Sequence, residues 1–229
     1  MATSMHTWDD DTNRFAHAVI DYAVERVHLA KDTQWGAHPA DVLQAAIAHA
    51  VAPQGVGGLE ALRLFREVLL PACRPMDDPM NLAYVPTAPS VASTMFDLVV
   101  SASSIFGGNW EAGAGAIAAE NQALRWLADL AGFPPDAGGV FVSGGSAANL
   151  SALVTAREVF TQRRGGRPPR YTVAVTEEVH ASVRAAARVM DVDVLPVHTD
   201  AHGRMTGAAL DAALHEHEHD SVFAVVATG

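Results

Sequence analysis

The sequence predicts an α/β fold in which a helical N-terminal segment precedes a mainly parallel sheet with flanking helices. Up to about residue 131, apolar residues recur at helical spacing between breaks rich in proline and glycine. From residue 139 onward, short apolar runs rich in β-branched residues alternate with helical stretches, which is typical of parallel strands joined by helices. One of these runs, GVFVS, leads through two glycines directly into a helical stretch. In α/β sheets, ligands bind at such strand exits.

The first half of the chain contains five predicted helices, over residues 12–31, 41–51, 59–70, 91–105 and 111–131. In the first of them, Phe15, Val19 and Tyr22 fall on one apolar stripe. Two prolines in the extended segment NLAYVPTAPS exclude a helix interior there. The serine that ends this segment, Ser90, is placed to cap the helix that follows.

The second half contains four predicted strands, over residues 139–143, 172–176, 192–197 and 222–228. Three predicted helices lie between them, over residues 147–162, 181–189 and 206–214. Because parallel strands end at the same edge of a sheet, we expect the residues that follow them to meet there. Three strand exits carry polar or small residues, namely 143–146, 177–180 and 228–229. The sequence therefore predicts a ligand site at this edge.

The composition is that of a globular protein and excludes several kinds of partner. The chain has 229 residues, 49% of them hydrophobic, and its net charge of −11 argues against a nucleic-acid partner. Its single cysteine, Cys73, cannot form an internal disulfide and fits a reducing compartment. No apolar run approaches membrane-spanning length, and no secretory signal is visible. We therefore expect a soluble, cytoplasmic protein without a membrane partner.

The double-glycine turn is suited to binding an anion. Gly144 and Gly145 allow the backbone to bend sharply and to approach a ligand closely. The free amides at the start of the next helix, together with the hydroxyl of Ser146, would then face a phosphate. The alternative is an ordinary strand-to-helix turn with Ser146 as the helix cap. The dinucleotide-binding and P-loop patterns are both absent, so the phosphate need not belong to a nucleotide.

His180 is the second candidate site residue, because it follows a strand and heads a helix. A flat ring at that position would lie beside whatever the phosphate anchors. The alternative is a histidine that only caps the helix or is partly exposed. Asn149 either supports the phosphate turn or has only a packing role in the fold, and the packing role is the preferred interpretation. The run from His215 to His219 is interpreted as a solvated turn, so no metal site is expected.

Two segments together resemble the pyridoxal-phosphate-dependent group II amino acid decarboxylases of fold type I, a family that includes aromatic-amino-acid and glutamate decarboxylases. These segments are VFVSGGSAANLSALVTAR and EEVHASVRAAARVMDVDVLPV. The segments NLAYVPTAPS and FGGNWEAGAGAIAAENQALRWLADLAGFP occur in that family's order and at its spacing. The resemblance extends from about residue 35 to the end of the sequence.

The resemblance implies pyridoxal 5′-phosphate as cofactor, with its phosphate on the glycine–serine turn and its ring against His180, the expected catalytic residue. The cofactor-binding residues would be Gly144, Gly145, Ser146, His180 and Thr228. The substrate-contacting residues would be Tyr84, Val85, Pro86, Thr87 and Trp110. Relatives are dimers whose helical N-terminal segment packs across the partner, so a homodimer is expected. The substrate would be a small molecule, an L-amino acid.

The sequence departs from the family pattern at three points. Where the family usually has Ser-Pro-Ala and a pair of glutamates, this chain has Gly113-Ala-Gly115 and only Glu120. Val85 is aliphatic where aromatic-amino-acid decarboxylases tend to have an aromatic residue, so no particular amino acid is assigned as substrate.

The third departure concerns the Schiff-base lysine and the carboxylate that keeps the pyridine nitrogen protonated, which lie downstream of residue 229 in the family. The only lysine here, Lys31, lies outside the matching region. The sequence is therefore interpreted as the amino-terminal part of a longer enzyme. Residues 1–75 would form a helical, dimer-packing segment, and residues 76–229 the first part of the large cofactor-binding domain.

The expected reaction is the decarboxylation of an L-amino acid to an amine and carbon dioxide. Two alternatives remain open. One is another fold type I enzyme, either an aminotransferase or a carbon–carbon lyase. The other is a non-catalytic subunit that binds the cofactor or pairs with a catalytic chain, an alternative favoured by the missing lysine. A nucleotide-binding domain is a more distant third.

Overall fold

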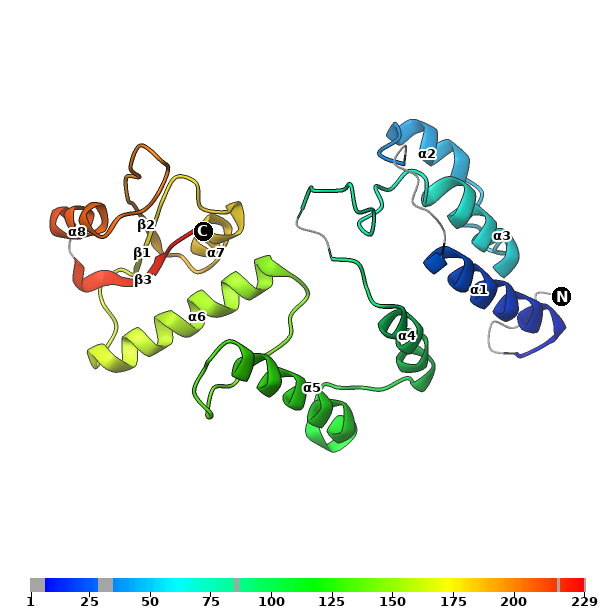
Figure 1. The fold of residues 1–229 in the computed structure, drawn as a ribbon, viewed down its shortest axis with the longest axis horizontal. Helices are drawn as coiled ribbons and strands as arrows, with labels where there is room; N and C mark the ends of the chain where they lie inside the picture. Colours follow the sequence, from blue (N-terminus) through cyan, green and yellow to red (C-terminus); the bar gives the residue numbers. More distant parts are fainter. Residues whose placement is uncertain (1–6, 29–34, 85–86, 218, 229) are drawn as a thin grey trace. The chain divides into compact units, whose positions relative to one another are not determined.

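The computed structural model describes residues 7–28, 35–84, 87–217 and 219–228 (Figure 1). The chain forms two compact units, residues 1–113 and residues 114–229. The predicted division at residue 75 concerns the domains of the whole enzyme and stays a prediction.

The first unit is helical. It contains α1 (Asp10–His28), α2 (Ala40–Ile47), α3 (Gly58–Leu64), a π-helical turn η1 (Phe65–Leu69) and α4 (Val91–Ser103). Residues 59–70 were predicted as a single helix, and the structure divides them between α3 and η1. Ser90 caps α4 as predicted, because its Oγ accepts a hydrogen bond from the backbone N–H of Ser93 at 3.1 Å.

In the first unit, side chains of α1 reach η1 and the loop that follows it. Tyr22 and Phe65 pack edge to face, with ring centroids 6.2 Å apart. The guanidinium of Arg26 donates two hydrogen bonds to the carboxylate of Asp77, both at 3.0 Å, and lies over the ring of Trp35. This pairing with Asp77 raises the pKa of Arg26 above its ordinary value. A bidentate ion pair thus fixes the loop after η1 to α1.

The helix α5 (Trp110–Leu130) begins in the first unit, and its backbone leaves helical geometry at Gly113. A Cβ atom at Gly113 would lie 2.4 Å from the carbonyl oxygen of Phe106, so no other residue fits without a backbone shift. The departure from the family pattern at this position therefore has a local steric reason.

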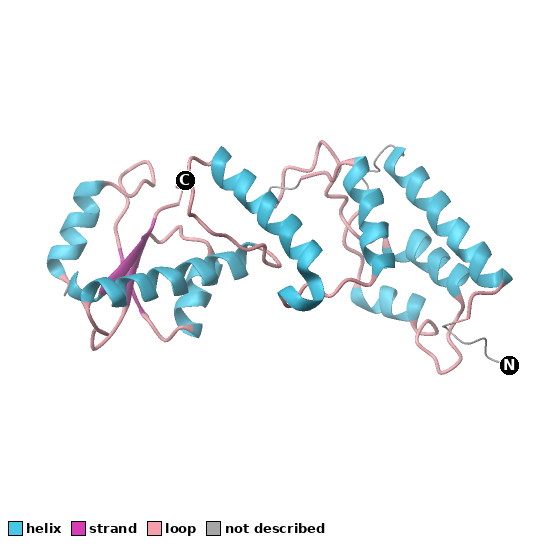
Figure 2. Cartoon of the chain, turned by 90° about the horizontal axis from the view of Figure 1, so that it is seen from below, coloured by secondary structure: helices cyan, strands magenta, loops and turns pink. Residues whose placement is uncertain are grey.

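The second unit contains the sheet. Its strands are β1 (Thr172–Val175), β2 (Asp193–Pro196) and β3 (Val222–Val226), and its other elements are α6 (Gly145–Arg164), α7 (Ala181–Val189), α8 (Gly207–Glu216) and the short η2 (His219–Ser221). The strands pair in the order β2-β1-β3, and both pairs are parallel. Figure 2 shows the sheet in magenta and the helices in cyan. The predicted sheet of parallel strands with flanking helices is confirmed, with these strands and helices within three residues of their predicted bounds.

The predicted strand over residues 139–143 is wrong. This segment is irregular and forms no ladder with the described strands. Its apolar side chains are exposed, with Phe141 at 54% and Val140 at 61%. The backbone N–H of Phe141 instead faces a carboxylate oxygen of Glu120 at 3.4 Å. An apolar segment forms a β-strand only when it pairs with a neighbouring strand. Periodicity alone does not show whether such a neighbour exists.

The core of the second unit lies around β1, whose four residues are all buried. Val173 and Val175 pack in one cluster with Leu153 of α6, with Val183 of α7 and with Phe223 of β3. Ala174, which alternation places on the opposite face, is also fully buried, so both faces of β1 are covered. The central strand is thus the best-packed element of the unit.

Replacing Val175 by alanine is expected to lower the free energy of unfolding by about 2 kcal/mol, because two buried methyl groups are lost and a cavity remains. The measurement is the thermal unfolding midpoint of the full-length protein. Val189→Ala is the matched control, since Val189 of α7 is 74% exposed. Equal midpoints for the two variants would contradict the assignment of β1 as the central core strand.

Candidate cofactor site

The turn before α6 has a backbone conformation that requires glycine. Gly144 is the N-cap of α6 and has φ +142° and ψ 171°, a region that residues with a Cβ rarely adopt. Its carbonyl accepts a hydrogen bond from the N–H of Ala148 at 3.1 Å, which starts the helix directly after the bend. The predicted sharp turn is therefore present, although the segment before it is not a strand.

The start of α6 is suited to an anion. Its N-cap glycine has no side chain that could satisfy the N–H groups of the first turn, and that turn carries no acidic residue. The first turn of α1, by contrast, carries Asp10 and Asp11. A Cβ built on Gly145 would meet no atom within 4 Å, so the space beside it is open. Helix α6 has 20 residues, and its N–H groups and its dipole both favour a phosphate at this end.

His180 is the N-cap of α7, so the capping alternative is correct. Its Nδ1 accepts a hydrogen bond from the backbone N–H of Ser182 at 3.2 Å and lies 2.7 Å from the Oγ of Ser182. The residue is nevertheless exposed. Only one edge of the ring is engaged by these contacts, and capping leaves the ring faces available for a ligand.

Asn149 connects the two helices. Its Nδ2 donates a hydrogen bond to the Oγ of Ser182 at 2.8 Å, so the second turn of α6 is joined to the first turn of α7. The preference for plain packing of Asn149 thus missed a directed hydrogen bond, and Ser182 was not recognised as a site residue at all. In the sequence, the position of Ser182 two residues after a candidate helix-capping histidine could have indicated its contact with that histidine. Its other partner, Asn149 of α6, depends on tertiary packing.

The second unit brings its predicted cofactor residues to one edge of the sheet. Because β1 and β3 are parallel neighbours, their carboxyl ends lie together. His180 follows β1, and Thr228 lies two residues after β3 and is exposed. The bond between Asn149 and Ser182 places the start of α6 beside the start of α7. The exits of β1 and β3 therefore converge as predicted, whereas the glycine turn follows no strand and is linked to them through Asn149 and Ser182. Contact with a cofactor stays a prediction.

The predicted substrate residues belong to the first unit. Tyr84 has φ +65° and is 83% exposed, and Trp110 is 61% exposed at the start of α5. Thr87 is exposed in the extended segment before α4. Val85 and Pro86 lie outside the described residues. The role of all five residues as substrate contacts stays a prediction.

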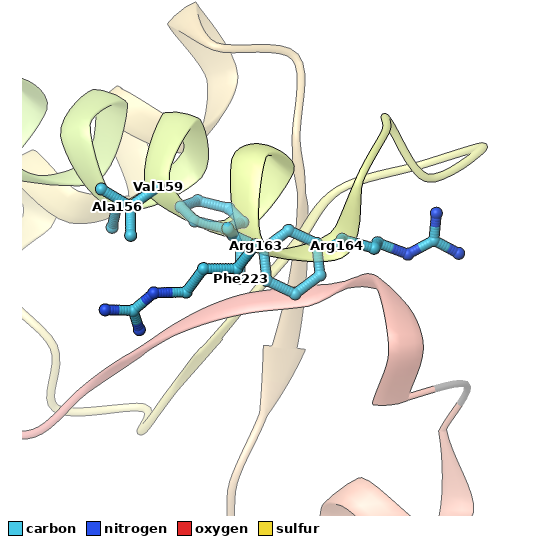
Figure 3. A pocket seen from close by; sticks show the side chains of 6 residues that line it. Ala156, Val159, Arg163, Arg164 and Phe223 are labelled. Atoms are coloured by element: carbon cyan, nitrogen blue, oxygen red, sulfur yellow. The ribbon is translucent and has the colours of Figure 1, made fainter.

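A surface pocket lies toward the other end of α6. Residues from that helix and one residue from β3 line it: Ala156, Val159, Phe160, Arg163, Arg164 and Phe223. In Figure 3 the guanidinium groups of Arg163 and Arg164 point in different directions, so they do not converge on one anion. This pocket is therefore not the candidate site.

In the part of the chain that the structure describes, no three histidine, cysteine, aspartate or glutamate side chains are grouped to hold a metal ion. None of the described helices is long and apolar enough to cross a membrane.

Known proteins resemble this chain in sequence. An aromatic-L-amino-acid decarboxylase of Bacillus atrophaeus is 26% identical over 220 residues, which cover 94% of this chain and 45% of that protein. A glutamate decarboxylase-like protein of Gibberella zeae is 34% identical over 143 residues, which cover 58% of this chain and 26% of that protein. This chain therefore spans less than half the length of these relatives.

The fold has solved counterparts. The crystal structure of Oryza sativa TDC with PLP and tryptamine superposes with a TM-score of 0.79 at 21% identity, covering 97% of this chain and 52% of that chain. This similarity confirms the predicted fold. The model of the pyridoxal-dependent decarboxylase conserved domain matches residues 58–229, which is most of the sequence. The chain belongs to the pyridoxal-dependent decarboxylase family.

Proposed function

We propose that the full-length protein uses pyridoxal phosphate to decarboxylate an L-amino acid to an amine and carbon dioxide. One observation carries the proposal. Helix α6, which begins uncapped at the glycine turn, is joined through Asn149 and Ser182 to the exposed His180, which follows β1. An anion site beside a flat ring suits a phosphorylated aromatic cofactor. Membership of the decarboxylase family supports the same assignment.

The residues present fit this cofactor. The first-turn N–H groups of α6, from Gly144 to Ser146, and the hydroxyl of Ser146 would hold its phosphate. His180 would hold the plane of its pyridine ring, and Thr228 would contact it from the end of β3. When bound, pyridoxal phosphate supplies an electron sink for the electrons that the departing carboxylate leaves behind. The task of these residues is to fix the cofactor relative to the substrate bond that breaks.

We also propose that the protein forms a homodimer in the cytoplasm. Helix α4 exposes five large apolar side chains in the single chain, an unusual density for a surface that stays in water: Val91, Phe96, Leu98, Val99 and Val100. A second copy of the protein would cover such a surface. The free, exposed thiol of Cys73 is compatible with a reducing compartment.

The activity is tested with full-length protein isolated from its source. We expect release of carbon dioxide and formation of the matching amine from at least one member of a panel containing aromatic L-amino acids and L-glutamate. Transfer of the amino group to a keto acid, without loss of carbon dioxide, would favour an aminotransferase instead.

Reduction with borohydride followed by peptide mapping tests the covalent attachment of the cofactor. We expect the pyridoxyl group on a lysine outside residues 1–229, because Lys31 lies outside the matching region. If Lys31 and the amino terminus carry the only label, or no label is found, a non-catalytic cofactor-binding or pairing subunit becomes the better account.

The phosphate site is tested by a charge change at Gly145. A side chain fits there without a clash, so Gly145→Asp and Gly145→Asn differ mainly in charge. The aspartate should weaken pyridoxal phosphate binding about tenfold or more relative to the asparagine, because a carboxylate within about 4 Å repels the phosphate. Thermal stability should not fall, since a negative charge suits a helix start. Cofactor titration measures the effect, and equal affinities would place the phosphate elsewhere.

The dimer is tested by sedimentation equilibrium of the full-length protein. We expect twice the chain mass, and Phe96→Asp in α4 should shift the equilibrium toward the monomer, because burying an unpaired carboxylate is costly. Val51→Asp is the control, since Val51 is 96% exposed on a loop. A monomeric wild-type enzyme with full activity would contradict the homodimer.

A further inference from the structure

A chain of hydrogen bonds connects the helix that begins at the glycine turn with the ring of His180. Asn149 Nδ2 lies 2.8 Å from Ser182 Oγ, and Ser182 Oγ lies 2.7 Å from His180 Nδ1. Ser182 is 7% exposed and Asn149 is partly buried, whereas His180 itself is exposed. The hydroxyl of a buried residue thus lies between an amide on α6 and the imidazole of an exposed histidine.

The direction of each hydrogen bond follows from what the groups can donate. The amide nitrogen of Asn149 has no lone pair to offer, so the hydroxyl of Ser182 accepts from it. The backbone N–H of Ser182 can only donate, and it points at Nδ1 of His180 at 3.2 Å. Nδ1 is therefore an acceptor, and the hydroxyl of Ser182 directs its own hydrogen to it. In the neutral ring, the hydrogen of His180 must then lie on Nε2.

We propose that Asn149 and Ser182 are positioning residues, which fix the plane and the tautomer of the His180 ring and act through it on bound pyridoxal phosphate. The inference rests on the proposed function, which places the cofactor ring against His180. Rotating the imidazole by half a turn would put a C–H group where Nδ1 now accepts two donors. Both hydrogen bonds would be lost, so the observed ring orientation is favoured.

The hydrogen bond from Asn149 also links the position of the His180 ring to helix α6. Asn149 lies on the same helix as the phosphate-binding turn, four residues after Gly145. The residue that orients the histidine is thus carried by the helix that would hold the phosphate. The distance between the anion site and the ring is thereby fixed by a direct side-chain contact between the two helices, in addition to their apolar packing.

The test uses full-length protein with nitrogen-15-labelled histidine, in cofactor-free and cofactor-bound forms. His180→Gln identifies the ring signals of His180 among the 11 histidines of residues 1–229. The variants are Asn149→Leu, Ser182→Ala and the double variant, with Ser182→Thr to restore the hydroxyl. Gln162→Leu is the matched control, because it removes an exposed amide near the other end of α6.

In the cofactor-free wild type, the nitrogen chemical shifts should show the neutral ring with its hydrogen on Nε2. In Ser182→Ala only the backbone N–H of residue 182 still donates to Nδ1, so the ring nitrogen shifts should move away from those of the wild type. Ser182→Ala and Asn149→Leu should each weaken pyridoxal phosphate binding by about 3- to 10-fold, the effect of one net hydrogen bond. The circular dichroism of the bound cofactor should fall in both. The double variant should be no worse than Ser182→Ala, and Ser182→Thr should restore the wild-type signals.

Several results would overturn the inference. One is a wild-type ring with its hydrogen on Nδ1; another is a pair of variants that lose thermal stability but keep the wild-type ring nitrogen shifts and cofactor dichroism. Additive losses in the double variant would show that the two residues do not act in series. Should the wild type bind no pyridoxal phosphate at all, the proposed function and this role fail together. Normal cofactor binding with unchanged variants refutes only the inference.

Discussion

The second unit depends on the burial of β1 between two parallel neighbours. All four of its residues are buried, and both of its edges are hydrogen-bonded. Because the pairs are parallel, the carboxyl ends of β1 and β3 lie at one edge, and whatever follows these strands is brought there. His180 and Thr228 therefore both follow strands that end at this edge of the sheet.

At that edge, a single residue has both a structural and a chemical role. His180 caps α7 with one edge of its ring, and this hydrogen bond is also what holds the ring in one orientation. Capping and cofactor binding were alternatives for this histidine at the level of the sequence. In the structure they are compatible, because a hydrogen bond in the ring plane leaves both ring faces free to stack. The buried Ser182 and Asn149 extend this restraint to α6.

Two residues in the segment that departs from the family pattern, Gly113 and Glu120, have local structural roles. Gly113 is required locally, since the carbonyl of Phe106 approaches too closely for any side chain. Glu120, the one glutamate retained, faces the backbone N–H of Phe141 just before the glycine turn. Both residues thus have a local structural function. The family resemblance therefore supports the cofactor site more strongly than it supports any particular substrate, whose predicted contacts lie in the other unit.

The sequence by itself determined the helices, β1, β2 and β3, the cap at Ser90 and the sharp turn at Gly144, because periodicity, capping residues and glycine act over a few residues. It also selected His180 and Ser146 as candidate site residues, and their contact with a cofactor stays a prediction. Only the tertiary structure decided that residues 139–143 form no strand, since a strand exists only with a partner beside it. The same holds for the bond between Asn149 and Ser182, which are distant in sequence and meet because α6 and α7 pack together.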